Sequence, residues 1–174
     1  MHDFDFWSMA GTYLDFPGHI LETDTGIDAA TVPIERVFRI PSQVVKLDRP
    51  DGSGAVKAED LARACPKGCS APGLIVNALG RRRFDEIAER SVYLSRDAVR
   101  WIVERGTTLL VSDIYESAAV PQDVFRTLFR ADIMTVCCPE RLAVIQADEA
   151  RVTALPIRCR DATQIPCRLV VEEV

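Results

Sequence analysis

The sequence lacks the features of a membrane-spanning or exported chain. No apolar run approaches the roughly 20 residues that cross a bilayer. The first residues lack the basic start and apolar core of a secretion signal, so we expect a cytoplasmic protein. Positive charge is also scarce: 21 Lys and Arg face 26 Asp and Glu, a net charge of −5. This acidic balance argues against nucleic acid or an anionic membrane as a partner.

A second cysteine pair is missing as well. Cys65 and Cys69 are spaced as in a zinc loop, but no further pair follows at the distance of a zinc finger. A structural zinc ion is therefore disfavoured. Because the chain has no export signal, we expect its six cysteines to be free thiols rather than disulfides. The apolar residues around Cys137 and Cys138 are typical of buried structural thiols.

What is present fits a globular α/β protein. The chain has 174 residues, 48% of them apolar and 27% charged, which is enough for one domain over residues 1–174 with a substantial core. No repeat, low-complexity tract or linker interrupts it. Strands and helices alternate in the middle of the chain, and strands prevail at its ends. The pattern predicts a single α/β domain with a mixed β-sheet and flanking helices.

Apolar spacing and capping residues locate the elements. Ser95 is a good helix N-cap and Gly106 a good helix end, so a helix is predicted between them. The apolar run 73–78 predicts a strand covered on both faces. Further helices are expected at residues 31–37 (with Thr31 as N-cap), 57–65 and from about Pro121, and further strands at 4–8, 44–47, 107–111, 133–136, 152–157 and 166–171.

Residues 9–19 form the most informative stretch. Gly11, Pro17 and Gly18 predict a shaped loop. Glycine adopts backbone angles that other residues rarely take, and proline fixes φ and donates no backbone hydrogen bond. The loop holds an acid, Asp15, and an imidazole, His19. On residue types alone, an ordinary turn with two surface side chains and a functional site are both open, and the turn is favoured.

The order of residues in this loop resembles the signature of the cyclase family, which includes bacterial kynurenine formamidase. That signature reads H-x-G-T-H-x-D-x-P-x-H. It is matched in register at five positions: Gly11, Thr12, Asp15, Pro17 and His19. Later segments are similar to the family too, among them Leu94-Ser95, the strand ending in Ser112-Asp113, and Pro166-Cys167-Arg168. The resemblance implies a swivelling β/β/α fold with its N-terminal strand segment shortened, and a homodimer or higher oligomer.

The resemblance also implies a zinc or manganese site, and here the sequence departs from the family. Met9 and Tyr13 stand where the signature has metal-binding histidines. Phe125 falls at a helix histidine and Cys137 at a glutamate, with Cys138 as the neighbouring option for that position. Only Asp15 is unchanged. Asp15 with Cys137 is a weak metal candidate, and the positions of Met9, Tyr13, Phe125 and Cys137 are expected to form a pocket.

Two functions follow from this pattern. In the first, the protein is a divergent family member that binds a small ligand or a partner subunit without the usual metal. In the second, it hydrolyses a small amide, formamide or lactone with His19 as acid/base group, at the family's acid/base position, with a rebuilt metal site or none. Two mechanisms are open for this hydrolase. Asp15 and His19 could together orient water, or His19 could activate Cys137 as a nucleophile. The run Arg81-Arg82-Arg83 is either a solvated loop, which is favoured, or a site for a carboxylate or phosphate.

Overall fold

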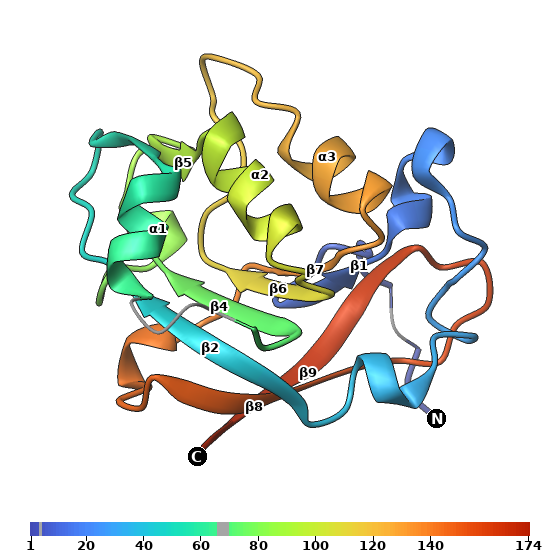
Figure 1. Cartoon of the computed structure of the whole chain (residues 1–174). Helices are drawn as coiled ribbons and strands as arrows, with labels where there is room; N and C mark the ends of the chain where they lie inside the picture. The colour runs from blue at the N-terminus through green and yellow to red at the C-terminus, as the bar shows by residue number, and fades with distance from the viewer. Residues whose placement is uncertain (4, 66–69) are drawn as a thin grey trace.

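The computed structural model describes residues 1–3, 5–65 and 70–174 (Figure 1). Its helices are α1 (Ala58–Ala64), α2 (Arg96–Glu104) and α3 (Val124–Arg130). Its strands are β1 (Tyr13–Asp15), β2 (Ile40–Lys46), β3 (Gly54–Val56), β4 (Gly73–Asn77), β5 (Val92–Leu94), β6 (Leu109–Ser112), β7 (Met134–Cys137), β8 (Glu149–Pro156) and β9 (Gln164–Glu173). Short 3-10 helices lie at Pro17–His19, Leu21–Thr23, Ile34–Arg36, Phe84–Glu86 and Leu142–Val144.

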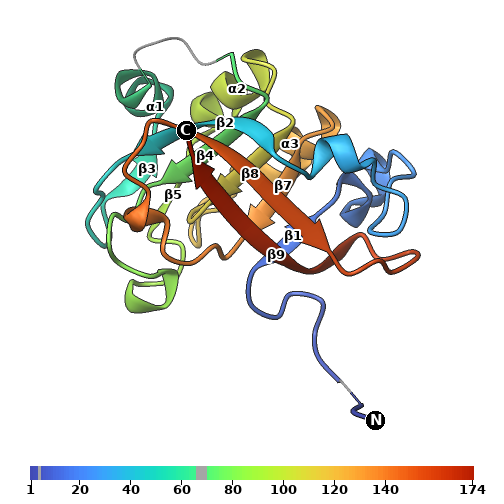
Figure 2. The ribbon, with the colours of Figure 1, turned by 90° about the horizontal axis from the view of Figure 1, so that it is seen from below.

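Seven of these strands close into a barrel in the order β1-β7-β6-β4-β2-β8-β9. Strands β2, β4, β6 and β7 run parallel, whereas β8 is antiparallel to β2 and β9. The three α-helices lie on one side of the barrel, and the long β8–β9 hairpin lies on the other (Figures 1 and 2). Strands β3 and β5 form a separate two-stranded parallel sheet.

The core has two layers because side chains alternate along each strand. Residues such as Leu14, Ile75 and Val136 come from different strands of the barrel and pack together inside it. Their neighbours in sequence, such as Leu74 on β4, point outward and pack with α1, α2 and α3. Among the described residues, no helix is long and apolar enough to cross a membrane.

The α/β class and most expected elements agree with the structure, but the description as a mixed sheet was incomplete because the sheet closes into a barrel. Strand β1 makes the closure by pairing with both β7 and β9. Its three residues had been assigned to a loop, since the flanking Gly11 and Pro17 dominate the local pattern. The predicted strand at 4–8 was wrong: its described residues are exposed and not in a strand.

Two other expectations need correction or fall outside the structure. The helix expected at 31–37 is a single 3-10 turn, Ile34–Arg36, which begins after Pro33 rather than at Thr31. Proline at this point has no N–H to give, so it suits a helix start. The α2 prediction was right in detail: Ser95 accepts a hydrogen bond from the Ala98 N–H. Of the Cys65 and Cys69 pair, Cys69 lies outside the described residues.

Candidate functional site

Strand β1 presents two of the predicted site residues on one face. Leu14 points into the barrel, so Tyr13 and Asp15 point outward, toward the helical layer. The antiparallel pairing with β7 places Tyr13 opposite Cys137 and Asp15 opposite Thr135. Residues that are more than a hundred positions apart in sequence therefore become neighbours.

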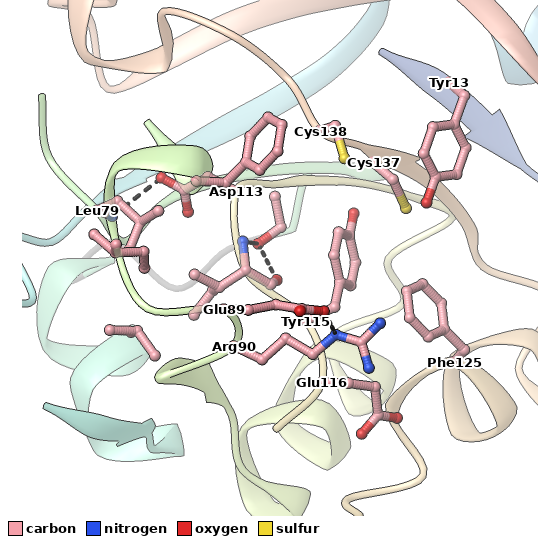
Figure 3. A pocket seen from close by; sticks show the side chains of 15 residues that line it. Tyr13, Leu79, Glu89, Arg90, Asp113, Tyr115, Glu116, Phe125, Cys137 and Cys138 are labelled. Carbon is pink, nitrogen blue, oxygen red and sulfur yellow. Dashed lines mark hydrogen bonds and ion pairs between the residues drawn. The ribbon is translucent and has the colours of Figure 1, made fainter. Parts of the chain in front are cut away.

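A cavity of about 330 Å³ lies between this face, α3 and the segments after β4 and β6 (Figure 3). Tyr13, Phe125 and Cys137 all line it, together with Tyr115. The rings of Tyr115 and Phe125 stack with centroids 5.0 Å apart and an interplanar angle of 24°. The Tyr115 hydroxyl donates to the Val136 carbonyl at 2.9 Å, which ties the ring to the barrel. Tyr13, Tyr115 and Phe125 therefore give the cavity an aromatic wall.

The structure brings together three of the four residues expected at this pocket. Met9 is the exception: it is 54% exposed and is not among the lining residues. It lies in the segment before β1, where the described residues up to Gly11 are exposed and Ser8 donates a hydrogen bond to the Gln164 side chain at 3.3 Å. A position in the signature does not by itself fold a segment onto a site.

Asp15 lies beside the cavity and is only 2% exposed. Its Oδ2 accepts a hydrogen bond from the Gln164 side chain at 3.3 Å, whereas Oδ1 has no hydrogen-bond partner among the described residues. Burial raises the pKa of this carboxyl to about 7, although the hydrogen bonds from Gln164 and Phe16 lower it. The His19 Nδ1 atom is 3.9 Å from Oδ1, too far for a hydrogen bond, and the His19 side chain is 45% exposed. His19 is not among the residues that line the cavity.

The two other polar groups at this face are neutral. Burial raises the pKa of the Cys137 thiol well above its ordinary value, and the nearby Asp15 charge raises it further. Burial likewise raises the pKa of Tyr13, whose hydroxyl is hydrogen-bonded with Cys137. A protonated thiol is a poor nucleophile and a poor metal ligand. This environment opposes the prediction of a Cys137 nucleophile.

The donor set does not fit a catalytic divalent cation. Zinc in such a site needs about three nitrogen, oxygen or sulfur ligands from the protein. At the expected positions, Phe125 has no donor atom, and Met9 is exposed and does not line the cavity. Among the described residues, no cluster of three or more His, Cys, Asp and Glu side chains is placed to hold a metal ion.

Sequence reasoning missed several lining residues. Tyr115 and Glu116 lie in the segment after β6, and Glu116 Oε1 accepts the Val124 N–H at 2.6 Å, which anchors the start of α3. Asp113 accepts the N–H groups of Ala78 and Leu79 at 2.8 and 3.0 Å, and burial raises the pKa of Asp113 to about 6. The available signal was their position after a parallel strand, where ligand sites of α/β sheets gather.

Residues 2–118 match the family model described as putative cyclase. No curated protein matches the chain. The fold is similar to a solved structure described as a potential metal-dependent hydrolase with cyclase activity, with a TM-score of 0.74 and 17% identity over 96% of this chain and 80% of the other. It is also similar to isatin hydrolase A from Labrenzia aggregata bound to benzyl benzoate, with a TM-score of 0.78 and 19% identity over 94% and 72%. Isatin hydrolase A from Ralstonia solanacearum gives a TM-score of 0.78 and 16% identity over the same shares.

Proposed function

Because this chain belongs to the cyclase family, we propose that it is a divergent member that binds a small planar molecule and does not use the metal chemistry of its relatives. One observation carries the proposal. Tyr13, Phe125 and Cys137 occupy positions where the resemblance implies metal ligands, and they line a single cavity with rings and a protonated thiol. Because these side chains replace metal ligands with apolar and aromatic groups, we expect the site to bind a hydrophobic molecule rather than a cation.

The chemistry of the cavity supports a planar, largely apolar ligand. Its volume of about 330 Å³ lies at the lower end of the range for small-molecule sites. The polar groups deep in it are already paired: the Ser112 hydroxyl bonds to the backbone of Ile114, and the Tyr115 hydroxyl to that of Val136. A ligand there gains from ring stacking on Tyr115 and Phe125 rather than from new hydrogen bonds.

Isatin and benzyl benzoate are suitable probes, because they are named with similar structures and both contain aromatic rings. Each is titrated into the purified protein by calorimetry. We expect saturable binding that Phe125→Ala weakens by about tenfold, since that change removes one stacking surface. Phe38→Ala is the control, because Phe38 is a phenylalanine that is 50% exposed and does not line the cavity.

Metal content tests the other half of the proposal. Elemental analysis of the purified protein should find zinc and manganese well below one ion per chain. Stoichiometric metal that disappears in Asp15→Ala would overturn the proposal. If neither probe binds, or if Phe125→Ala and Phe38→Ala weaken binding equally, the proposed ligand site is contradicted.

A hydrolase acting through His19 is the second candidate, and the proximity of His19 Nδ1 to Asp15 Oδ1 at 3.9 Å favours it. A small shift of the exposed imidazole would form an acid–base pair with the buried carboxylate. Hydrolysis of an aryl formamide or of isatin, lost in His19→Ala and insensitive to chelators, would support this candidate. Absence of turnover in the wild-type protein would dismiss it.

A homodimer or higher oligomer remains a prediction. Its motivation in the structure is the exposed apolar side chains before β1: Phe6, Trp7 and Met9 are between 50% and 86% exposed. Sedimentation equilibrium measures the mass of the particle directly. We expect at least twice the 19.3 kDa of one chain, and a shift toward the monomer in Trp7→Ser. A monomer at every concentration would contradict the prediction.

A further inference from the structure

A second cavity, of about 450 Å³, lies where the parallel strands β2 and β4 end. Its lining includes Lys46 and Asn77, the last residues of these strands, and Arg81 and Arg82 from the loop after β4. None of these residues lines the aromatic cavity. The carboxyl ends of parallel strands are a common place for ligands, because side chains and loops from several strands converge there.

Asn77 is a buried polar side chain with an unmet hydrogen bond. It is 3% exposed, and its Oδ1 has no hydrogen-bond partner among the described residues. Two residues before it on the same face of β4, Ile75 packs inside the barrel. A buried amide on this apolar face of β4 lowers the stability of the fold unless a hydrogen-bond partner pairs with it. Its position in the cavity lining makes a ligand the natural partner.

Arg82 adds an unmet donor beside the same cavity. Its Nη2 atom donates to Asp48 Oδ1 at 2.6 Å and to the Arg49 carbonyl at 2.8 Å, so the guanidinium is held in one orientation. Its Nε atom is buried and has no acceptor among the described residues. The Asp48 carboxylate also lines the cavity, but it is already paired with this arginine.

The charges of this cavity oppose those of the whole chain. Lys46, Arg81 and Arg82 face one lining carboxylate, Asp48, in a protein of net charge −5. Lys46 bonds to Asp148 at 3.2 Å, outside the lining. Arg81 is exposed and makes no hydrogen bond or ion pair with the part of the chain that the structure describes. Its guanidinium is therefore available to an anion.

We propose that this cavity binds a phosphate group. Phosphate oxygens accept hydrogen bonds from Arg81, Arg82 and Lys46, and guanidinium groups suit them particularly well. At neutral pH, phosphate also carries a P–O–H donor, which can pair with Asn77 Oδ1. Sulfate has the same shape and charge but no proton to donate, so the Asn77 amide distinguishes the two anions.

Calorimetric titration at low ionic strength tests the proposal, with inorganic phosphate, glycerol 3-phosphate and sulfate as separate probes. We expect saturable binding of phosphate, at least about fivefold weaker binding of sulfate, and about tenfold weaker phosphate binding in Arg81→Gln. In Asn77→Leu, the preference for phosphate over sulfate should disappear. Tighter binding of inorganic phosphate or of glycerol 3-phosphate identifies the source of the phosphate group.

Arg100→Gln is the matched control, since Arg100 is an exposed arginine on α2 that makes no hydrogen bond or ion pair with the described residues and lies outside the cavity lining. It should leave the affinity for phosphate unchanged. The exposed Arg81 keeps the test valid if Asn77→Leu does not fold, which circular dichroism checks. No saturable phosphate binding, equal binding of sulfate by the wild-type protein, or equal weakening by Arg81→Gln and Arg100→Gln would each overturn the proposal.

Discussion

Asp15 illustrates how burial sets the chemistry of a single residue. Its carboxyl is almost fully buried, has one oxygen without a partner in the described part of the chain, and has a pKa raised from 3.8 to about 7. A metal ion or a strong donor would lower this pKa, because each favours the charged carboxylate. The protein instead places Asp15 among groups that are neutral, namely the Tyr13 hydroxyl and the Cys137 thiol.

The first prediction concerns the pH dependence of stability. In the unfolded chain the Asp15 carboxyl ionises near its ordinary pKa of 3.8, whereas in the folded chain it ionises near 7. Between these values the folded state binds more protons, so the free energy of unfolding falls as the pH rises from 4 to 7. The contribution of Asp15 is roughly 4 kcal/mol, and urea unfolding over this pH range measures it.

Asp15→Asn should flatten this decline and stabilise the protein at pH 7. Some decline should remain, because burial also raises the pKa of Asp113, to about 6, with the same sign. Asp5→Asn, at an exposed position, serves as the control and should leave the curve unchanged. An unaltered slope in Asp15→Asn would show that the folded-state pKa of Asp15 is close to its ordinary value.

The second prediction concerns thiol reactivity. Cys137 is buried with a raised pKa, whereas Cys159 is exposed. Since the thiolate is the reactive form, iodoacetamide at pH 8 should alkylate Cys159 long before Cys137. Peptide mass spectrometry over time measures the two rates. Fast labelling of Cys137 in the native protein would contradict this prediction and support Cys137 as a nucleophile.

Among the elements, α2 shows how a short helix is held in place. The Ser95 hydroxyl accepts the Ala98 N–H at 3.3 Å and donates to the Val56 carbonyl at 2.8 Å, so it caps α2 and joins it to β3. Gly106 ends the helical segment with a φ of +77°, a conformation that residues with a Cβ rarely adopt. Both ends of the helix are therefore determined by single residues.

The third prediction tests this cap. Ser95→Ala removes the side-chain acceptor at the start of α2 and one of the two donors to the Val56 carbonyl, which keeps the hydrogen bond from the residue 95 N–H. We expect a loss of about 1 to 2 kcal/mol in the free energy of unfolding, measured with urea. Ser70→Ala, at an exposed position, should cost much less. Equal losses in the two variants would show that the cap contributes nothing specific.

At the scale of the whole molecule, the barrel depends on its shortest strand. Strand β1 has three residues, yet it pairs with β7 on one side and with β9 on the other. Leu14 at its centre is fully buried inside the barrel. The same three residues carry Tyr13 and Asp15 on the outer face, so closure of the barrel and assembly of the site depend on one segment.

The fourth prediction follows from this dependence. Leu14→Ala should destabilise the protein by about 2 to 5 kcal/mol, because it leaves a cavity in the barrel core. It should also weaken binding of the aromatic probe, since β1 positions Tyr13. Leu155→Ala, which truncates a leucine that is 40% exposed, is the control for both readouts. A loss of stability without any loss of binding would show that the site does not depend on closure of the barrel.

The sequence alone determined the elements whose signals are local. The cap at Ser95 and the apolar run of β4 each depend on a few adjacent residues, and both were predicted correctly. The loop signature around Asp15 identified the family before the structure was known. These inferences succeed because backbone preferences and residue order are properties of short segments.

Only the tertiary structure decided how distant segments meet. No local pattern indicates that β1 pairs with both β7 and β9, that Tyr115 stacks on Phe125, or that Asn77 and Arg82 share a cavity. The tertiary structure also separated Met9 from the pocket and buried Cys137, which raises the pKa of its thiol. Strand pairing and burial arise from the packing of residues far apart in sequence, so the charge state and accessibility of a side chain are defined only after the barrel has closed.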